Sequence, residues 1–231
     1  MKHLIPLISF LLVFPGCALF VTMPNKIDSQ YLRNKTASQQ NKIEKIEKEI
    51  IKITNSKNSI DKKLKVNTYK KKISEKMVTR HKNYKEILDD KQRLYIIVND
   101  SEKLLMLRND IKRNNREYNT EKLKLKYYNA NEKDLKALVE LKDAELSYKV
   151  SQKLLIEAKI GRENQDKILG KTKKDPKDKK DNERINVKKY EEYSNTQKRN
   201  FEEKRKNQNK TKNLKKLALE KLKQAGFAEE L

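Results

Sequence analysis

The chain has 231 residues, of which 35% are hydrophobic, 39% are charged and only 6% are aromatic. So few apolar residues cannot build one large globular core, and we expect an elongated or partly disordered molecule. The formal charge of +24 predicts a salt-dependent attraction to anionic surfaces. A Lys-rich composition imposed by an AT-rich genome would give the same charge without selection for binding.

The N-terminus has the composition of an export signal. Met1–His3 is short and basic, and Leu4–Phe14 is an apolar stretch of the length found in signal peptides. The single cysteine, Cys17, follows this stretch. One cysteine can form neither an internal disulfide nor a multi-cysteine metal site, so its position is the informative feature.

The residues Val13-Phe14-Pro15-Gly16-Cys17 resemble the lipobox of bacterial lipoprotein signal peptides. Gly16 supplies the small residue that such a box needs before its cysteine, whereas Phe14 and Pro15 depart from the usual pattern. The resemblance implies cleavage after Gly16 and attachment of diacylglycerol to Cys17. Two or more acyl chains, at about 0.8 kcal/mol per buried methylene, anchor a protein stably.

The resemblance also implies a location in the bacterial cell envelope. Ala18 and Leu19 follow the cysteine, without the Asp that retains many lipoproteins at the inner membrane, so the outer membrane is favoured. Two alternatives stay open. An uncleaved transmembrane helix could run over Leu4–Met23, although Pro6 and Pro15 weaken it. An ordinary secreted protein would lose Cys17 with its signal.

Helix is the expected structure of the remaining chain. Between Pro24 and Gly161 there is neither Gly nor Pro, and both residues interrupt helices. Apolar residues recur there in steps of three and four, which is typical of coiled coils. A first stripe consists of Ile43, Ile46, Ile50, Ile53, Ile60 and Leu64, and a second of Tyr84, Ile87, Leu94, Val98 and Leu105.

A heptad of small residues is the best candidate for a closely packed core. Its members are Ala130, Ala137, Ala144, Ser151 and Ala158. Small residues allow helices to approach closely, and neighbouring Leu and Val residues widen the apolar face beyond a two-stranded seam. This helix vaguely resembles the helical hairpins of outer-membrane efflux channels, which would imply a subunit of an envelope-spanning transport or secretion assembly.

Clusters of Asn, Ser and Asp mark plausible helix starts at Thr54–Ser59, Asn99–Ser101 and Asn129–Asn131, the last with Asp134 in its first turn. We therefore expect turns near residues 100 and 130. Gly226 is expected to end the last helix as a left-handed cap. The expected segments are a signal peptide (1–16), a lipid-anchored tether (17–41), a helical or coiled-coil domain (42–160), a linker (161–182) and a basic helical tail (183–231).

No catalytic constellation is present in the sequence. The mature chain has one histidine, His81, in a polar helical stretch, where we expect a solvated side chain. Clustered glycines for phosphate binding are missing. We expect no enzyme activity, no cofactor and no metal site.

The fold class expected is all-α, an elongated helical hairpin or coiled-coil bundle with a basic, partly disordered C-terminal helix. The function expected is that of a non-enzymatic, lipid-anchored envelope spacer or interaction scaffold. Its partners would be the membrane, anionic lipids or polymers of the envelope or a host, and a second copy or an envelope protein. Tyr190, Tyr193 and Phe201 interleave with the basic residues of the tail, as in nucleic-acid-binding segments, but export makes nucleic acid a poor first choice.

Overall fold

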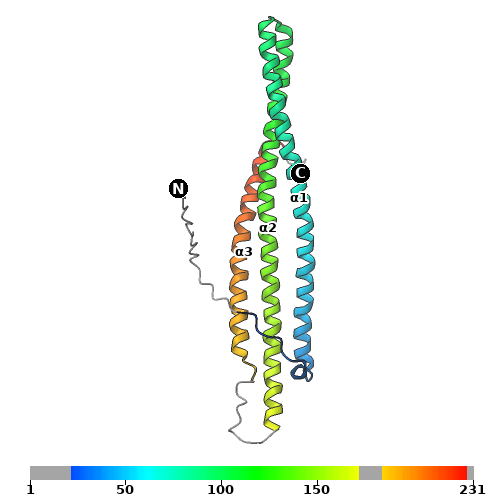
Figure 1. Cartoon of the computed structure of the whole chain (residues 1–231), viewed down its shortest axis with the longest axis vertical. Coiled ribbons are helices and arrows are strands. Elements are labelled where there is room, and N and C mark those ends of the chain that lie inside the picture. The colour runs from blue at the N-terminus through cyan, green and yellow to red at the C-terminus, as the bar shows by residue number, and fades with distance from the viewer. Residues whose placement is uncertain (1–21, 172–183, 228–231) are drawn as a thin grey trace, which may run out of the picture.

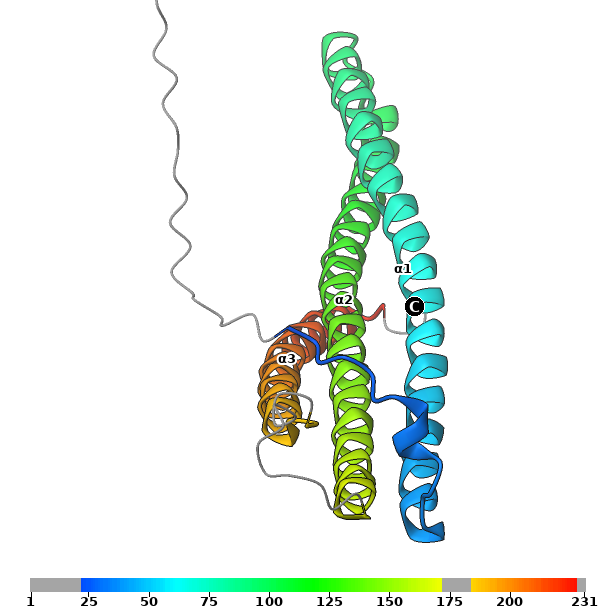
Figure 2. The ribbon, with the colours of Figure 1, turned by 60° about the horizontal axis from the view of Figure 1, so that its bottom comes forward.

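A computed structural model of the chain describes residues 22–171 and 184–227, and it is all-α, as the sequence predicts. The elements are the 3-10 helix η1 (Ser29–Leu32), α1 (Ala37–Ile97), α2 (Ser101–Lys171) and α3 (Val187–Gln224). α2 lies in the middle, with α1 on one side and α3 on the other (Figure 1, Figure 2). Within the described residues α1 and α3 do not pack against each other, so the three helices form an open, elongated assembly.

α1 is one continuous helix of 61 residues, about 90 Å long at ~1.5 Å per residue. A capping box begins it. The Thr36 hydroxyl accepts from the Gln39 backbone N–H at 3.2 Å, and the Gln39 amide oxygen accepts from the Thr36 N–H at 2.9 Å. The helix start expected at Thr54–Ser59 is wrong, because α1 runs through that segment. The Thr54 hydroxyl donates to the Ile50 carbonyl one turn back, which accommodates the residue within a helix.

The turn expected near residue 100 is confirmed. Asn99 has a left-handed backbone with a φ of 52°, and the N–H groups of Asn99 and Asp100 donate to the carbonyls of Ile96 and Tyr95. This is a Schellman-type ending for α1. Asp100 then caps α2 by accepting from the Lys103 N–H at 3.0 Å. Two helices joined by so short a turn must run antiparallel.

The turn expected near residue 130 is wrong, because α2 continues through Asn129–Asn131 without a break. These polar residues form contacts with other helices and do not form a turn. Asn131 donates to the side chain of Asn67 on α1 at 2.6 Å. Asp134 faces α3, where it accepts from Gln208 at 3.2 Å. The polar cluster therefore marks where α2 meets both neighbours.

Gly161 does not end a helix either, because α2 extends to Lys171, past the domain boundary expected at residue 160. A Cβ on Gly161 would lie 2.8 Å from Cγ2 of Ile27 and 2.9 Å from Cδ1 of Ile185. The glycine thus lets two segments cross α2 closely. The rest of the expected linker, from residue 172, lies outside the described residues up to Glu183.

The segment 22–36, called here the strap, fastens the N-terminal side of the chain to the foot of the molecule. It crosses from α3 to the beginning of α1 (Figure 2). The Tyr190 hydroxyl of α3 donates to the Asn25 carbonyl at 2.7 Å, and the Asn164 amide of α2 donates to the Tyr31 carbonyl at 2.7 Å. All three helices are therefore linked at the end opposite the α1–α2 turn.

The small-residue heptad forms the core between α2 and α3, as the sequence predicts for its later members. Ala137, Ala144, Ser151 and Ala158 are buried. Ala158 lies in a cluster with Leu154, Tyr190 and Tyr193, and the Ser151 and Ser194 hydroxyls lie 3.3 Å apart. The basic C-terminal segment is thus held as one helix along α2.

The expected cap at Gly226 is confirmed. Gly226 has a φ of 82°, and the N–H groups of Gly226 and Phe227 donate to the carbonyls of Lys223 and Leu222. These are the two bonds of a Schellman motif. The Phe227 ring turns back toward α2, where the Arg116 guanidinium lies 5.7 Å from its centroid.

Candidate anion-binding cleft and polar seam

The residues of α1 that pack against α2 along their seam repeat at a strict seven-residue spacing. They are buried at every seventh position: Ile53, Ile60, Asn67, Ser74, His81 and Leu88. A seven-residue spacing keeps one face of a helix against its partner. The first predicted stripe is confirmed here, because Ile43, Ile53 and Ile60 are buried, whereas the middle of this seam is polar.

Each polar member of this seam has partners on α2. The Asn67 amide donates to the Tyr128 carbonyl at 2.9 Å. The Ser74 hydroxyl lies 3.1 Å from the Glu121 carbonyl and 2.7 Å from its carboxylate. These bonds compensate for burying polar groups and fix the register of the two helices.

His81 is buried, contrary to the expectation of a solvated side chain, with 9% of its surface exposed. The Asn114 amide nitrogen donates to the His81 carbonyl at 3.0 Å, so the amide oxygen faces the ring, 2.8 Å from Nδ1. Nδ1 must therefore carry a proton, because an amide oxygen only accepts. The seven-residue spacing from Ile53 and Ile60 is the sequence signal that would have found this position.

The second predicted stripe is wrong as a core seam. Tyr84, Ile87, Leu94, Val98 and Leu105 are all exposed. The buried residues at this end are Leu88 and Leu107, which continue the heptads of His81 and Asn114. At this end of α1, α2 therefore covers Leu88 and leaves the neighbouring apolar residues Ile87 and Leu94 exposed.

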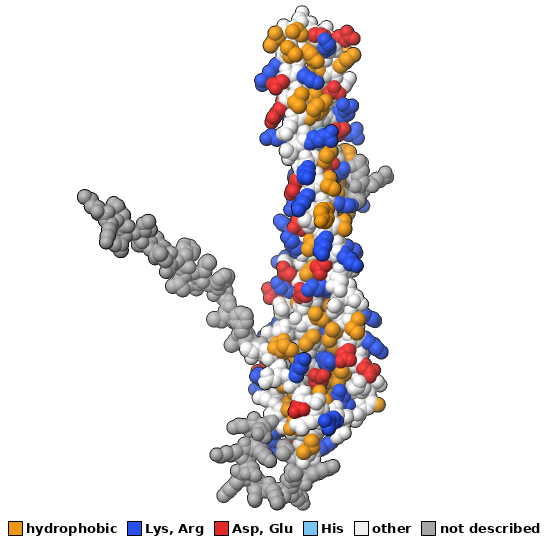
Figure 3. All heavy atoms as spheres, turned by 45° about the vertical axis from the view of Figure 1, so that its right-hand side comes forward, with side chains coloured by type: hydrophobic (Ala, Val, Ile, Leu, Met, Phe, Trp, Pro, Cys, Tyr) orange, Lys and Arg blue, Asp and Glu red, His pale blue; other side chains and the backbone are white. Residues whose placement is uncertain are grey.

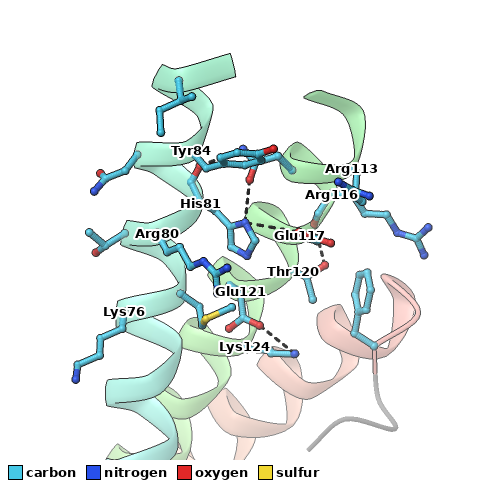
Figure 4. Close-up of a pocket in the computed structure, with 16 residues that line it drawn as sticks. Lys76, Arg80, His81, Tyr84, Arg113, Arg116, Glu117, Thr120, Glu121 and Lys124 are labelled. Carbon is cyan, nitrogen blue, oxygen red and sulfur yellow. Dashed lines mark hydrogen bonds and ion pairs between the residues drawn. The ribbon is translucent and has the colours of Figure 1, made fainter. Parts of the chain in front are cut away.

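A cleft of about 1300 Å³ opens between α1 and α2 beside this polar seam. His81 points from α1 into the space between the helices, toward Glu117 on α2 (Figure 4). Phe227, just beyond the end of α3, also lines the cleft. α3 therefore stops where the cleft begins, and the hairpin beyond it has two helices.

The cleft is cationic. Its charged lining residues are Lys76, Arg80, Arg113, Arg116, Lys124, Glu117 and Glu121. Lys124 pairs with Glu121 at 3.1 Å. Lys76 and Arg80 have no ion pair with any residue that the structure describes. Unpaired cations beside an open cleft favour the binding of carboxylate, phosphate or sulfate groups.

The aromatic residues of the basic tail serve packing. Tyr190 and Tyr193 are buried against α2, and Phe201 stacks on Tyr148 with the ring centroids 6.1 Å apart. Burial raises the pKa of the Tyr190 hydroxyl. Several tail cations are also used within the chain, as Lys204 with Glu140 at 2.8 Å shows. The outward face of α3 keeps the remaining cations.

The predicted lipidation site, Cys17, lies outside the described residues. In the part that is described, none of the helices combines the length and the apolar character needed to cross a membrane. The same part brings together no group of three potential metal-ligating side chains.

Compared with protein-family models, with curated proteins and with solved structures, the chain matches none. Its function is therefore argued from its own residues.

Proposed function

We propose that this chain is a non-enzymatic, lipid-anchored helical protein of the bacterial cell envelope that holds an interaction surface away from the membrane. Cys17 carries the lipid in this proposal, after cleavage behind Gly16, and the outer membrane is the favoured location. The hairpin of α1 and α2 is the spacer.

The position of the strap is the observation that supports this proposal most directly. It begins a few residues after Cys17 and is fastened to α3 and α2 by Tyr190 and Asn164. The turn at Val98–Asp100 lies at the opposite end of the molecule (Figure 1). A lipid on Cys17 would therefore hold the foot at the membrane and leave the tip of the hairpin to project.

Anionic polymers or lipids are the proposed ligands of the cationic surfaces. The cleft beside His81 carries cations that have no ion pair among the described residues, as Lys76 and Arg80 illustrate, and α3 is rich in Lys and Arg. Electrostatic attraction to phosphate- or sulfate-bearing surfaces follows from such charge, and it weakens as salt screens it.

The transport-assembly alternative has less support. It depends on a free small-residue heptad, and α3 already covers that face at Ser151 and Ala158. A face that is packed within the chain is not free to line a ring of copies.

The test is the intact mass of the protein extracted from membranes of the native host, compared with Cys17→Ser, after labelling with fatty acid. Because the chain has a single cysteine, loss of label in the variant identifies the thiol that is modified. We expect wild type to lack residues 1–16, to carry acyl mass and to sediment with membranes, and Cys17→Ser to do none of these. A full-length, unlabelled wild type would contradict the proposal and favour the transmembrane alternative.

A further inference from the structure

The tip half of α1 has two heptad faces. The inward face contains Asn67, Ser74 and His81 and packs on α2. The residue directly before each of these inward residues faces outward, toward solvent. Along the tip half of α1 this outward face is apolar at its two ends and polar between them. Its members, called here the outer stripe, are Val66, Tyr69, Ile73, Ile87, Leu94 and Ile97. The polar face is therefore buried and the apolar face is exposed.

The outer stripe is long and largely uncovered. Val66, Ile73, Ile87 and Leu94 are 56%, 62%, 51% and 53% exposed. From Val66 to Ile97 the stripe extends about 45 Å at ~1.5 Å per residue. α3 contacts α2 and not α1, so no described element covers it. Exposed apolar residues at both ends of such a stripe are typical of an interaction site, and Figure 3 shows hydrophobic side chains at the surface along the column.

The spacing of the stripe favours a helix as its occupant. Val66, Tyr69 and Ile73 follow steps of three and four, as do the positions onward to Ile87, Leu94 and Ile97. Two apolar positions per heptad make the narrow seam of a coiled coil, whereas a helix that lies in a membrane surface needs a broader apolar face. A third helix along α1 would bury the stripe by the packing that already joins α1 to α2.

Charge decides which kind of helix fits. Within or directly beside the stripe, between residues 62 and 94, there are many exposed cations, whereas the same range has only four carboxylates, Glu75, Glu86, Asp89 and Asp90. The cations are Lys62, Lys63, Lys65, Lys70, Lys72, Lys76, Arg80, Lys91 and Arg93. A second copy of this chain would place like charges along both edges of the seam, which destabilises a coiled coil. An acidic partner would meet opposite charges.

We propose that the outer stripe of α1 docks an acidic amphipathic α-helix of another protein, completing a three-helix coiled coil at the tip. The partner carries apolar residues at heptad spacing, with Glu or Asp on both edges. Near Arg80, where the stripe itself is polar, the partner presents a carboxylate. The inference rests on the proposed function, because it names the partner that the projected tip would hold.

The test uses the full chain with Cys17→Ser, so that binding is measured without acylation and a failed anchor does not affect it. The probe is a synthetic four-heptad peptide with Ile and Leu at its seam positions and Glu on both edges. A matched peptide has Lys at every Glu position. Fluorescence anisotropy of labelled peptide measures binding at low and at high salt.

We expect the Glu peptide to bind, more weakly at high salt, and the Lys peptide not to bind. The double variant Ile73→Glu/Ile87→Glu should weaken binding at least tenfold while its circular dichroism stays unchanged, because both side chains are exposed. Ile51→Glu is the matched control. Ile51 is also exposed on α1 but lies outside the outer stripe, so its affinity should equal that of the parent chain.

Four results would overturn the proposal. Equal binding of both peptides, or no effect of the double variant, would show that the stripe does not select an acidic helix. A dimer in light scattering that the double variant abolishes would make a second copy the occupant. Binding to anionic vesicles that depends on Ile73 and Ile87, without peptide binding, would make it a membrane surface.

Discussion

His81 and Asn114 form a closed pair across the α1–α2 seam, in which the ring nitrogen Nδ1 lies 2.8 Å from the amide oxygen and the amide nitrogen donates to the His81 carbonyl at 3.0 Å. Both side chains are buried. The pair satisfies the polar groups that each residue brings into the seam. The contribution of the pair to the free energy of unfolding therefore depends on both residues being present.

Asn114→Leu should lower the free energy of unfolding by about 1–3 kcal/mol, because the protonated Nδ1 of His81 would lose its acceptor in a buried site. The Glu117 carboxylate, 3.7 Å from Nδ1, is too distant to replace it without movement. Urea denaturation of both single variants and of His81→Leu/Asn114→Leu forms a double-mutant cycle. The double variant should be more stable than Asn114→Leu alone. Simple additivity of the two single effects would show that the pair is not coupled.

Glu132 should make stability depend on pH. Hydrogen bonds from Lys136 and from Lys71 of α1 hold the pKa of this carboxyl below its usual value of 4.5. A lowered folded-state pKa contributes stability above the unfolded value, and that contribution is lost as pH falls through the folded one. Glu132→Gln should therefore melt at a lower temperature than wild type at pH 7, and this difference should shrink as pH falls below 4.5.

Thermal melts followed by circular dichroism between pH 7 and pH 2 measure the effect of Glu132→Gln. Glu86→Gln is the control, because Glu86 is exposed and makes no ion pair with a described residue. A deficit of Glu132→Gln that stayed constant as pH fell from 7 to 2 would mean that the residue acts through its shape and not through its charge.

Gly161→Ala should destabilise the protein by about 1 kcal/mol, although Ala normally stabilises a helix interior relative to Gly. The new Cβ would come within 2.8 Å of Ile27 and 2.9 Å of Ile185. The strap would shift, and limited proteolysis between residues 22 and 36 would become faster. The double variant Gly161→Ala/Ile27→Ala tests which contact matters. If the contact with Ile27 is the whole cause of the destabilisation, adding Gly161→Ala to Ile27→Ala should not make cleavage faster.

Ala158→Leu should cost about 1–3 kcal/mol, because the larger side chain has no room between α2 and α3. Ala158 is 0% exposed and touches the cluster of Tyr190 and Tyr193. Ala130→Leu is the matched control, since Ala130 belongs to the same heptad but is only half-buried. Equal losses in the two variants, measured by chemical denaturation, would contradict a core that depends on close approach at Ala158.

Sequence reasoning located the features that depend on neighbouring residues. The turn at Asn99–Ser101 follows from a cluster of side chains that can cap a helix start, and the cap at Gly226 follows from a residue that tolerates a left-handed backbone. The heptad from Ala137 to Ala158 follows from the helical repeat. Reasoning of the same local kind failed at Gly161 and at Asn131, where a residue typical of helix ends serves a contact with a segment far away in the chain.

The candidate cleft was not predicted, because it depends on which stripe of α1 faces α2. Ile87 and Leu88 are adjacent and both apolar, yet Leu88 is buried and Ile87 is 51% exposed. Adjacent residues point about 100° apart on a helix, so choosing one stripe exposes the other. Periodicity indicates that a stripe needs a partner and does not say which partner it has.

The sequence by itself determined that this protein is helical, that it folds back near residue 100, and that a small-residue heptad lies in its core, because backbone preference and helical repeat are properties of short segments. Only the tertiary structure decided that the polar heptad of Asn67, Ser74 and His81 is buried while the outer stripe faces solvent. The physical reason is that α2 supplies hydrogen-bond partners at matching intervals, from Tyr128 to Asn114. Those partners lie dozens of residues away along the chain and meet α1 only after the hairpin closes.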